Sequence, residues 1–172
     1  MLYDIQKTYD GTPISYAPND YWIKQIPKGY TLEFALEGSQ TETGEFNVKN
    51  LYNLPYVIRN ERGEDVTENF YLKIEGTGLR VNRRIIHISS ASAKMEYNGQ
   101  ELTDDTVTIT LGTLVEGHEL ICEVTGSITE VGIATNTIEG HKIVDQNEKD
   151  CTDFYEVKYV HGTLEITKGP VV

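Results

Sequence analysis

The sequence has few of the residues that build disulfide frameworks, metal centres or membrane spans. Only two of its 172 residues are cysteine, and no run approaches the about 18 consecutive apolar residues of a membrane helix. No window of a dozen residues combines a 3.6-residue apolar period with helix caps, which argues against any helix longer than a single turn. Basic residues are scarce as well: 15 stand against 27 acidic ones, and the net charge of −12 disfavours nucleic acid and anionic membranes as partners.

What the sequence does contain favours β structure. Its 11 tyrosines and many threonines, valines and isoleucines are typical of strands. Residues 30–36 and 118–124 alternate between apolar and polar side chains, the pattern of a half-buried strand. We therefore expect an all-β protein with no substantial helix. The expected core side chains are Leu32, Phe34, Leu36, Leu79 and Val81, and later in the chain Leu120, Cys122, Val124, Leu164 and Ile166.

An internal repeat organises the chain. Tyr9-Asp10-Gly11 recurs 88 residues later as Tyr97-Asn98-Gly99. The same offset relates Gly29, Leu32, Gly38, Ser39, Thr41, Glu42 and Gly44 to Gly117, Leu120, Gly126, Ser127, Thr129, Glu130 and Gly132. Further along the offset is 85, which relates residues 65–68 to 150–153 and residues 78–81 to 163–166. A fixed period of this size indicates two tandem units of one fold.

The repeat predicts a domain at residues 1–82, a second domain at 83–167, and a linker at 168–172 that leads toward a further repeat. Each domain is expected to be an Ig-like sandwich or a β-grasp-like curled sheet. Further strands are expected at 20–24, 46–48, 106–111 and around Ala134, and a closing hairpin at 70–74 with 79–81 and at 155–159 with 164–166. The connection at residues 82–84 has no Gly, Pro or Ser, so we expect it to restrict the swing between domains.

The ends of the chain suggest a piece of a longer protein. No charged and then apolar leader follows Met1, and residues 168–172 interrupt and then restart an apolar run. The second copy also has a longer lead before its Tyr-Asn-Gly triplet, at residues 84–88, than the first copy has before its own.

The motifs resemble those of a known family. They are Lys7-Thr-Tyr-Asp-Gly-Thr-Pro13, the stretches 115–120 and 125–132, the Asp-x-Thr-x pattern at 65–68 and 150–153, and the terminal strand at 162–167. Together they resemble the Tyr-Asp-Gly repeats that form long arrays in surface proteins of Gram-positive bacteria. The chain departs from the pattern at Asn98, in the shorter loop before Phe154 and in the Gly76-Thr77-Gly78 turn.

The resemblance implies a cell-wall-attached or secreted protein whose repeats act as spacers or adhesive modules. It implies no catalytic residues and no cofactor, an extracellular location, a monomer within a longer multi-repeat chain, and a host glycan or matrix protein as possible partner. The alternative is a carbohydrate-binding module appended to a secreted hydrolase. An enzyme in its own right would need a deep cleft with paired carboxylates.

Two polar loops offer hard oxygen donors for calcium. The candidates are Asn60, Glu61 and Asp65 in the first copy and Asp145, Asn147 and Asp150 in the second. Neither loop has the full ligand spacing of a calcium loop, and Asx-rich turns of this kind commonly form without metal.

The remaining candidates are aromatic residues and cysteines. Trp22, with Tyr21 and Tyr30, could form a platform for sugar rings, although such residues more often belong to the core. Cys122 and Cys151 replace apolar residues of the first copy, so they are either buried thiols or a disulfide between neighbouring strands. The four histidines show no metal-binding spacing.

Overall fold

The computed structural model describes residues 1–76 and 78–171, and most of them lie in or between short strands. Helical structure in this part of the chain is limited to the 3₁₀ segments η1 (Val48–Asn53), η2 (Thr67–Asn69) and η3 (Thr152–Phe154). The expected all-β class without substantial helix is confirmed. Thr77 of the expected 76–78 turn and Val172 of the expected linker lie outside the described residues.

The first of two compact units comprises Met1–Asn82. Its strands are β1 (Ile5–Thr8), β2 (Ile14–Ser15), β3 (Thr31–Phe34), β4 (Ser39–Gln40), β5 (Gly44–Glu45), β6 (Tyr56–Arg59) and β7 (Leu79–Asn82). They form small sheets with the orders β1-β7-β5, β2-β4 and β3-β6. β1 and β7, the first and last strands of the unit, are neighbours in one sheet and run parallel.

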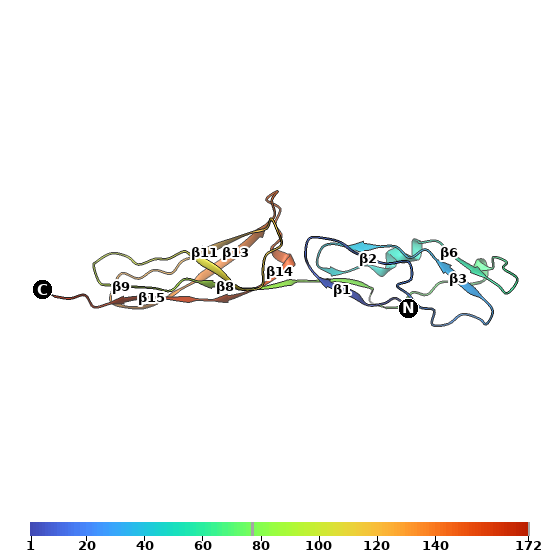
Figure 1. Cartoon of the computed structure of the whole chain (residues 1–172), viewed down its shortest axis with the longest axis horizontal. Helices are drawn as coiled ribbons and strands as arrows, with labels where there is room; N and C mark the ends of the chain where they lie inside the picture. Colours follow the sequence, from blue (N-terminus) through green and yellow to red (C-terminus); the bar gives the residue numbers. More distant parts are fainter. Residues whose placement is uncertain (77, 172) are drawn as a thin grey trace. The chain divides into compact units, whose positions relative to one another are not determined.

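The second unit comprises Arg83–Val172. Its strands are β8 (Arg84–Ser90), β9 (Ala93–Glu96), β10 (Val107–Leu111), β11 (Glu119–Val124), β12 (Gly132–Asn136), β13 (Ile138–Val144), β14 (Tyr155–Val160) and β15 (Gly162–Thr167). The sheets are β10-β8-β14, β11-β13 and β12-β15-β9, and Figure 1 shows β9 and β15 running alongside each other.

Strand pairing follows the sequence repeat residue by residue. In the first unit β3 pairs with β6 so that Phe34 faces Tyr56, and in the second β11 pairs with β13 so that Cys122 faces His141. The parallel pairs agree in the same way, because Ile5 faces Leu79 and its counterpart Ala93 faces Leu164. The offsets of 88 and 85 therefore relate strand partners in the structure as well as matching residues in the sequence.

The Tyr-Asp/Asn-Gly triplet closes the ladder between the first and last of these parallel strands. The Tyr9 N–H donates to Asn82 O at 2.8 Å, and the Tyr97 N–H donates to Thr167 O at 2.8 Å. The following glycines have φ +80 and +76, so each chain turns sharply at a conformation that favours glycine. The triplet has a structural role in both units.

The core contains most of the expected side chains. Leu79 and Leu164 are completely buried, and Val81 and Ile166 are nearly so. The alternating strand of the second unit is shallower than expected, because Leu120, Cys122 and Val124 of β11 are only half-buried. In the first unit Phe34 and Leu36 are buried, while Leu32 is half-buried.

Three expected elements differ from the structure. The closing hairpin is wrong, because β14 pairs with β8 whereas β15 pairs with β12 and β9. The chain thus passes from one sheet to another at His161 instead of turning back. Residues 20–24 form only a bridge from Tyr21 to Leu2, and residues 70–74 form no strand. Residues 46–48 form no strand, because Val48 already begins η1. This 3₁₀ segment spans six residues and so exceeds a single turn.

Candidate functional site

A groove of about 500 Å³ lies in the first unit. Residues 21–27 and 70–75 line its sides, and Leu32, Phe34 and Ile58 form its apolar base. Met1 and Leu2 lie at one end, where the Leu2 N–H donates to Glu75 O at 2.8 Å and the Trp22 N–H donates to Met1 O at 2.9 Å. Neither side of the groove, residues 21–27 or 70–75, contains a regular strand.

Two of the three aromatic residues singled out from the sequence, Tyr21 and Trp22, line the groove. Tyr21 packs its ring edge-on against Phe34 at a centroid distance of 5.5 Å, and Tyr30 packs against Phe70 at 5.7 Å. Trp22 lines the groove and is 44% exposed. Of the three residues, only Trp22 is among the exposed large hydrophobic side chains.

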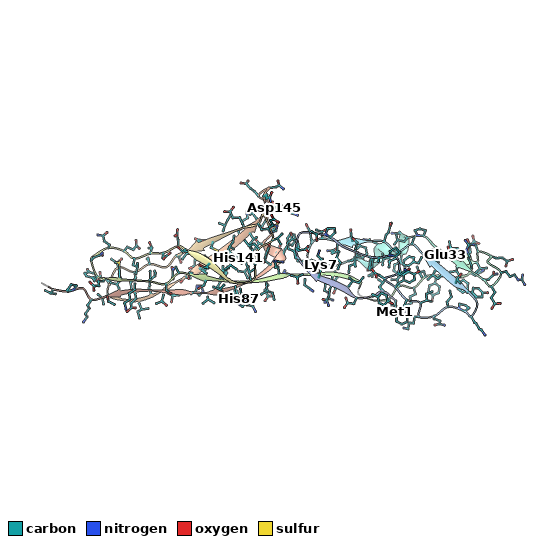
Figure 2. All side chains as sticks on the ribbon, in the orientation of Figure 1. Met1, Lys7, Glu33, His87, His141 and Asp145 are labelled. Atoms are coloured by element: carbon teal, nitrogen blue, oxygen red, sulfur yellow. The ribbon has the colours of Figure 1, made fainter. Side chains whose placement is uncertain are left out.

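Charged groups cluster at the end of the groove near Met1, which is labelled in Figure 2. The Met1 ammonium donates to Trp22 O at 2.9 Å, and its partial burial lowers the pKa of this amine. Lys73 and Lys24 pair with Glu75 at 2.6 and 3.1 Å. Their hydrogen bonds lower the pKa of the Glu75 carboxyl to about 2, so this carboxylate remains ionised over the whole neutral range.

The side-chain oxygens proposed as calcium ligands in the two loops already accept hydrogen bonds from the backbone of their own turns. Asn60 Oδ1 accepts from the N–H groups of Arg62 and Glu64, each at 3.0 Å. Asp145 Oδ1, at the projecting loop labelled in Figure 2, accepts from the N–H groups of Asn147 and Lys149 at 2.8 and 3.0 Å. These carbonyl and carboxylate oxygens hold the two loops in the same conformation.

The aspartates that follow each loop cap a 3₁₀ turn. Asp65 Oδ1 accepts from the N–H and the hydroxyl of Thr67, and Asp150 Oδ1 accepts from the Thr152 N–H. These bonds lower the pKa of both carboxyls. Within residues 1–76 and 78–171, no three His, Cys, Asp or Glu side chains converge as a metal-ligand set. Glu61 instead lies against the backbone of Gly29.

The cysteines and histidines of the second unit belong to its packing. Cys122 is half-buried and Cys151 is buried, and both side chains are thiols rather than halves of a disulfide. Burial raises the pKa of the Cys122 thiol, which opposes its use as a nucleophile. His118 Nδ1 lies 2.8 Å from the Tyr155 hydroxyl, and His141 hydrogen-bonds the Tyr159 hydroxyl. Figure 2 labels His141 and His87 on separate strands.

The groove was not among the sequence predictions, and the first residues of the chain help to line it. The longer lead of the second copy, residues 84–88, becomes part of β8, and β8 is the central strand of the sheet β10-β8-β14. At the 88-residue offset Met1 and Leu2 correspond to Ser89 and Ser90. Met1 and Leu2 thus occupy the positions that end β8 in the second unit, and both line the groove.

No family model, curated protein or solved structure gives a significant match to this chain. No helix among the described residues is long and apolar enough to cross a membrane.

Proposed function

We propose that this chain is a non-enzymatic, extracellular repeat module of a bacterial surface protein that acts as a stalk, with adhesion as a possible added role. The observation that supports this proposal is that the last strand of each unit pairs in parallel with a strand near the N-terminal end of the same unit. β1 pairs with β7, and β9 pairs with β15, with matching registers.

Parallel pairing of this kind suits a load-bearing role because of the direction in which a pull acts on the two strands. A pull on the two ends of such a unit draws neighbouring strands in opposite directions along their length. The bonds of the ladder, including those from Ile5 N–H to Gly78 O at 2.9 Å and from Tyr9 N–H to Asn82 O at 2.8 Å, are then sheared together. They cannot be broken one at a time, so forced unfolding has to cross a high barrier.

Single-molecule force spectroscopy on the intact chain tests the stalk proposal. We expect two discrete unfolding events, one for each unit. Ile5→Pro removes the N–H that bonds Gly78 O and should lower the unfolding force of the first unit, while the second unit of the same molecule serves as internal control. Gradual extension without discrete events, or no effect of Ile5→Pro, would contradict a load-bearing role.

The exposure of Trp22 favours a second candidate, binding of carbohydrate as a module of a secreted hydrolase. An exposed indole beside an apolar groove can stack on a sugar ring. A screen of glycans and matrix proteins against wild-type protein and Trp22→Ala tests this candidate. A glycan bound by the wild type and lost in the variant would favour the binding module over the pure stalk.

A further inference from the structure

The sequence contains one Asn-Gly pair, Asn98-Gly99, and it lies in the exposed turn that follows β9. Asparagine followed by glycine loses ammonia readily, because glycine puts no side chain beside the backbone nitrogen that attacks the asparagine amide. Gly99 has φ +76, and no described atom beyond its chain neighbours lies within 4 Å of a Cβ built on it. The turn therefore leaves room for this reaction.

A hydrogen bond holds the Asn98 amide close to the peptide that would attack it. The Gln100 N–H donates to Asn98 Oδ1 at 2.9 Å, which closes an Asx turn and folds the side chain back over the following peptide. Attack on the amide carbon places negative charge on this oxygen, so the N–H that already bonds it stabilises the intermediate. The Gly99 N–H donates none of the hydrogen bonds described for residues 1–76 and 78–171.

We propose that Asn98 and Gly99 form a self-modifying site, at which the chain converts its own asparagine to an isoaspartyl or aspartyl residue. The Gly99 nitrogen forms a bond to Asn98 Cγ, the bond from Cγ to Nδ2 breaks, and Nδ2 leaves as ammonia. The proton that Gly99 loses to solvent balances the one that the ammonia takes up. Water then opens the five-membered imide, either at Cγ, which gives an aspartyl residue, or at the main-chain carbonyl, which gives an isoaspartyl residue.

The equivalent pair of the first unit, Asp10-Gly11, is protected from the same reaction. Lys7 pairs with Asp10 Oδ1 at 2.7 Å, and the N–H and hydroxyl of Thr12 donate to the same oxygen at 2.9 and 2.7 Å. These bonds lower the pKa of the Asp10 carboxyl, so it stays ionised, and a carboxylate resists attack by an amide nitrogen. The second unit therefore carries the reactive form of the triplet.

The second unit does not repeat the partners that stabilise the charge at Asp10. At the offset of 88, Lys7 corresponds to Met95 and Thr12 to Gln100. A carboxylate at position 98 would also stand between two further acidic residues, Glu96 and Glu101. The modified turn therefore differs from its counterpart in the first unit even where the product is an ordinary aspartyl residue.

The isoaspartyl product would change the end of the ladder between β9 and β15. The Tyr97 N–H donates to Thr167 O at 2.8 Å, and Tyr97 O lies 2.8 Å from a Cβ built on Gly169. Tyr97 is thus held in place directly before the reacting residue. An isoaspartyl residue adds one methylene group to the main chain of the turn, so we expect the bond from Tyr97 to open. This proposal does not depend on the proposed stalk function.

Incubation of the intact chain at pH 8, followed by peptide mapping with mass spectrometry, tests the reaction. Asn98 should exchange its NH₂ group for OH and give both the isoaspartyl and the aspartyl form, because both arise from one imide. Asn147 is the internal control, since it is exposed and precedes Glu148, whose φ is +63; it should react at least about tenfold more slowly. An unchanged Asn98, or an aspartyl product alone, would overturn the proposal.

Two substitutions test the imide route. Glu148→Gly removes the side chain after Asn147 at a backbone already in the left-handed region, so Asn147 should react at least about tenfold faster. Asn98→Gln keeps an amide at the site but needs a larger ring, and it should lose no ammonia over the same time. No acceleration at Asn147, or loss of ammonia from Asn98→Gln at the wild-type rate, would contradict the route.

A synthetic peptide of residues 94–102 measures the contribution of the fold. The hydrogen bond from the Gln100 N–H is already formed in the folded turn, so the intact chain should react no more slowly than the peptide. A slower reaction in the intact chain would mean that the fold protects Asn98, and it would overturn the proposal.

Hydrogen exchange measures the effect on the ladder after ion exchange has separated the modified chain. The Tyr97 amide should exchange at least about tenfold faster in the isoaspartyl form, because its bond to Thr167 opens. The Tyr9 amide, which donates to Asn82 O at 2.8 Å in the first unit, is the control and should keep its protection. Equal protection of Tyr97 in both forms would overturn the predicted opening of the ladder.

Discussion

The Ser90 hydroxyl donates a hydrogen bond of 2.5 Å to the carbonyl oxygen of Asn136, and both residues are buried in the second unit. The same hydroxyl accepts from the Gly162 N–H at 2.9 Å. The Asn136 side chain in turn donates to Ala91 O and Asp104 O at 2.9 and 2.7 Å. These bonds join β8, β12 and β15, which belong to two different sheets.

Ser90→Ala should therefore destabilise the second unit strongly, although it removes only one hydroxyl group. It leaves the Gly162 N–H and one acceptor site of Asn136 O without this partner, and a buried polar group without a partner costs about 1–3 kcal/mol. Denaturant titration measures the loss in free energy of unfolding. The control is Ser92→Ala, which removes an exposed acceptor of the Thr163 N–H and should cost about 0.5 kcal/mol or less. Similar losses in the two variants would show that the buried network contributes little.

Leu79→Ala and Leu164→Ala test the equivalence of the two cores. The two leucines correspond at the 85-residue offset, and both are 0% exposed. Each truncation should lower the free energy of unfolding of its own unit by about 2–5 kcal/mol, through lost burial and a residual cavity. Ile133→Ala, at a side chain 71% exposed, should change it by less than about 0.5 kcal/mol. A loss below about 0.5 kcal/mol at either leucine would contradict the common register.

The core residues show which features of the fold the alternating sequence pattern could predict. Alternation correctly predicted which residues of β7 and β15 face inward, since it depends only on the local pleat. It did not predict depth, and Leu120 is half-buried because depth depends on what covers the strand. It also failed for the hairpin, because the partner of β14 is β8, a strand about 70 residues away in sequence.

The candidate site was harder to predict for a related reason. The polar loops have the oxygen atoms that calcium needs, but Asn60 and Asp145 use theirs to cap their own turns, which spacing alone could not decide. No sequence motif marks the groove. Its sides are irregular segments, residues 21–27 and 70–75, and their placement depends on long-range contacts such as the bond from the Leu2 N–H to Glu75 O.

Gly112 and Gly99 offer a matched test of close packing. Their φ angles are nearly equal, +78 and +76, so alanine meets the same backbone strain at both. A Cβ on Gly112 would lie 2.3 Å from Ile85 O, whereas nothing lies within 4 Å of one on Gly99. Gly99→Ala should cost about 1–2 kcal/mol, from the left-handed conformation alone. Gly112→Ala should cost clearly more by denaturant titration, and equal costs would mean that β8 yields easily at this contact.

The final prediction concerns pH and rests on His118 and His141. Burial lowers the pKa of both imidazoles, and each ring nitrogen Nδ1 is hydrogen-bonded to a tyrosine hydroxyl. Because the Tyr155 hydroxyl already accepts from the Val115 N–H at 3.0 Å, its proton is available to donate to neutral His118. Protonation of these rings in the folded state would cost both their burial and these bonds.

The sign follows from proton binding in the two states. A histidine whose pKa is lowered by folding binds more protons in the unfolded chain, so its contribution is complete above the unfolded value of about 6.5 and is lost as pH falls. The thermal midpoint of the second unit should therefore decline from pH 7 to pH 5. His118→Gln with His141→Gln should flatten this decline.

Asp150→Asn is the control, because it acts in a different window. Hydrogen bonds from the hydroxyl and N–H of Thr152 lower the pKa of Asp150, so its contribution is present above about pH 4 and is lost only below it. Asp150→Asn should therefore keep the decline between pH 7 and pH 5 and reduce the one at lower pH. If the thermal midpoint of the double histidine variant declines between pH 7 and pH 5 as steeply as that of the wild type, the two half-buried imidazoles are not the groups that titrate.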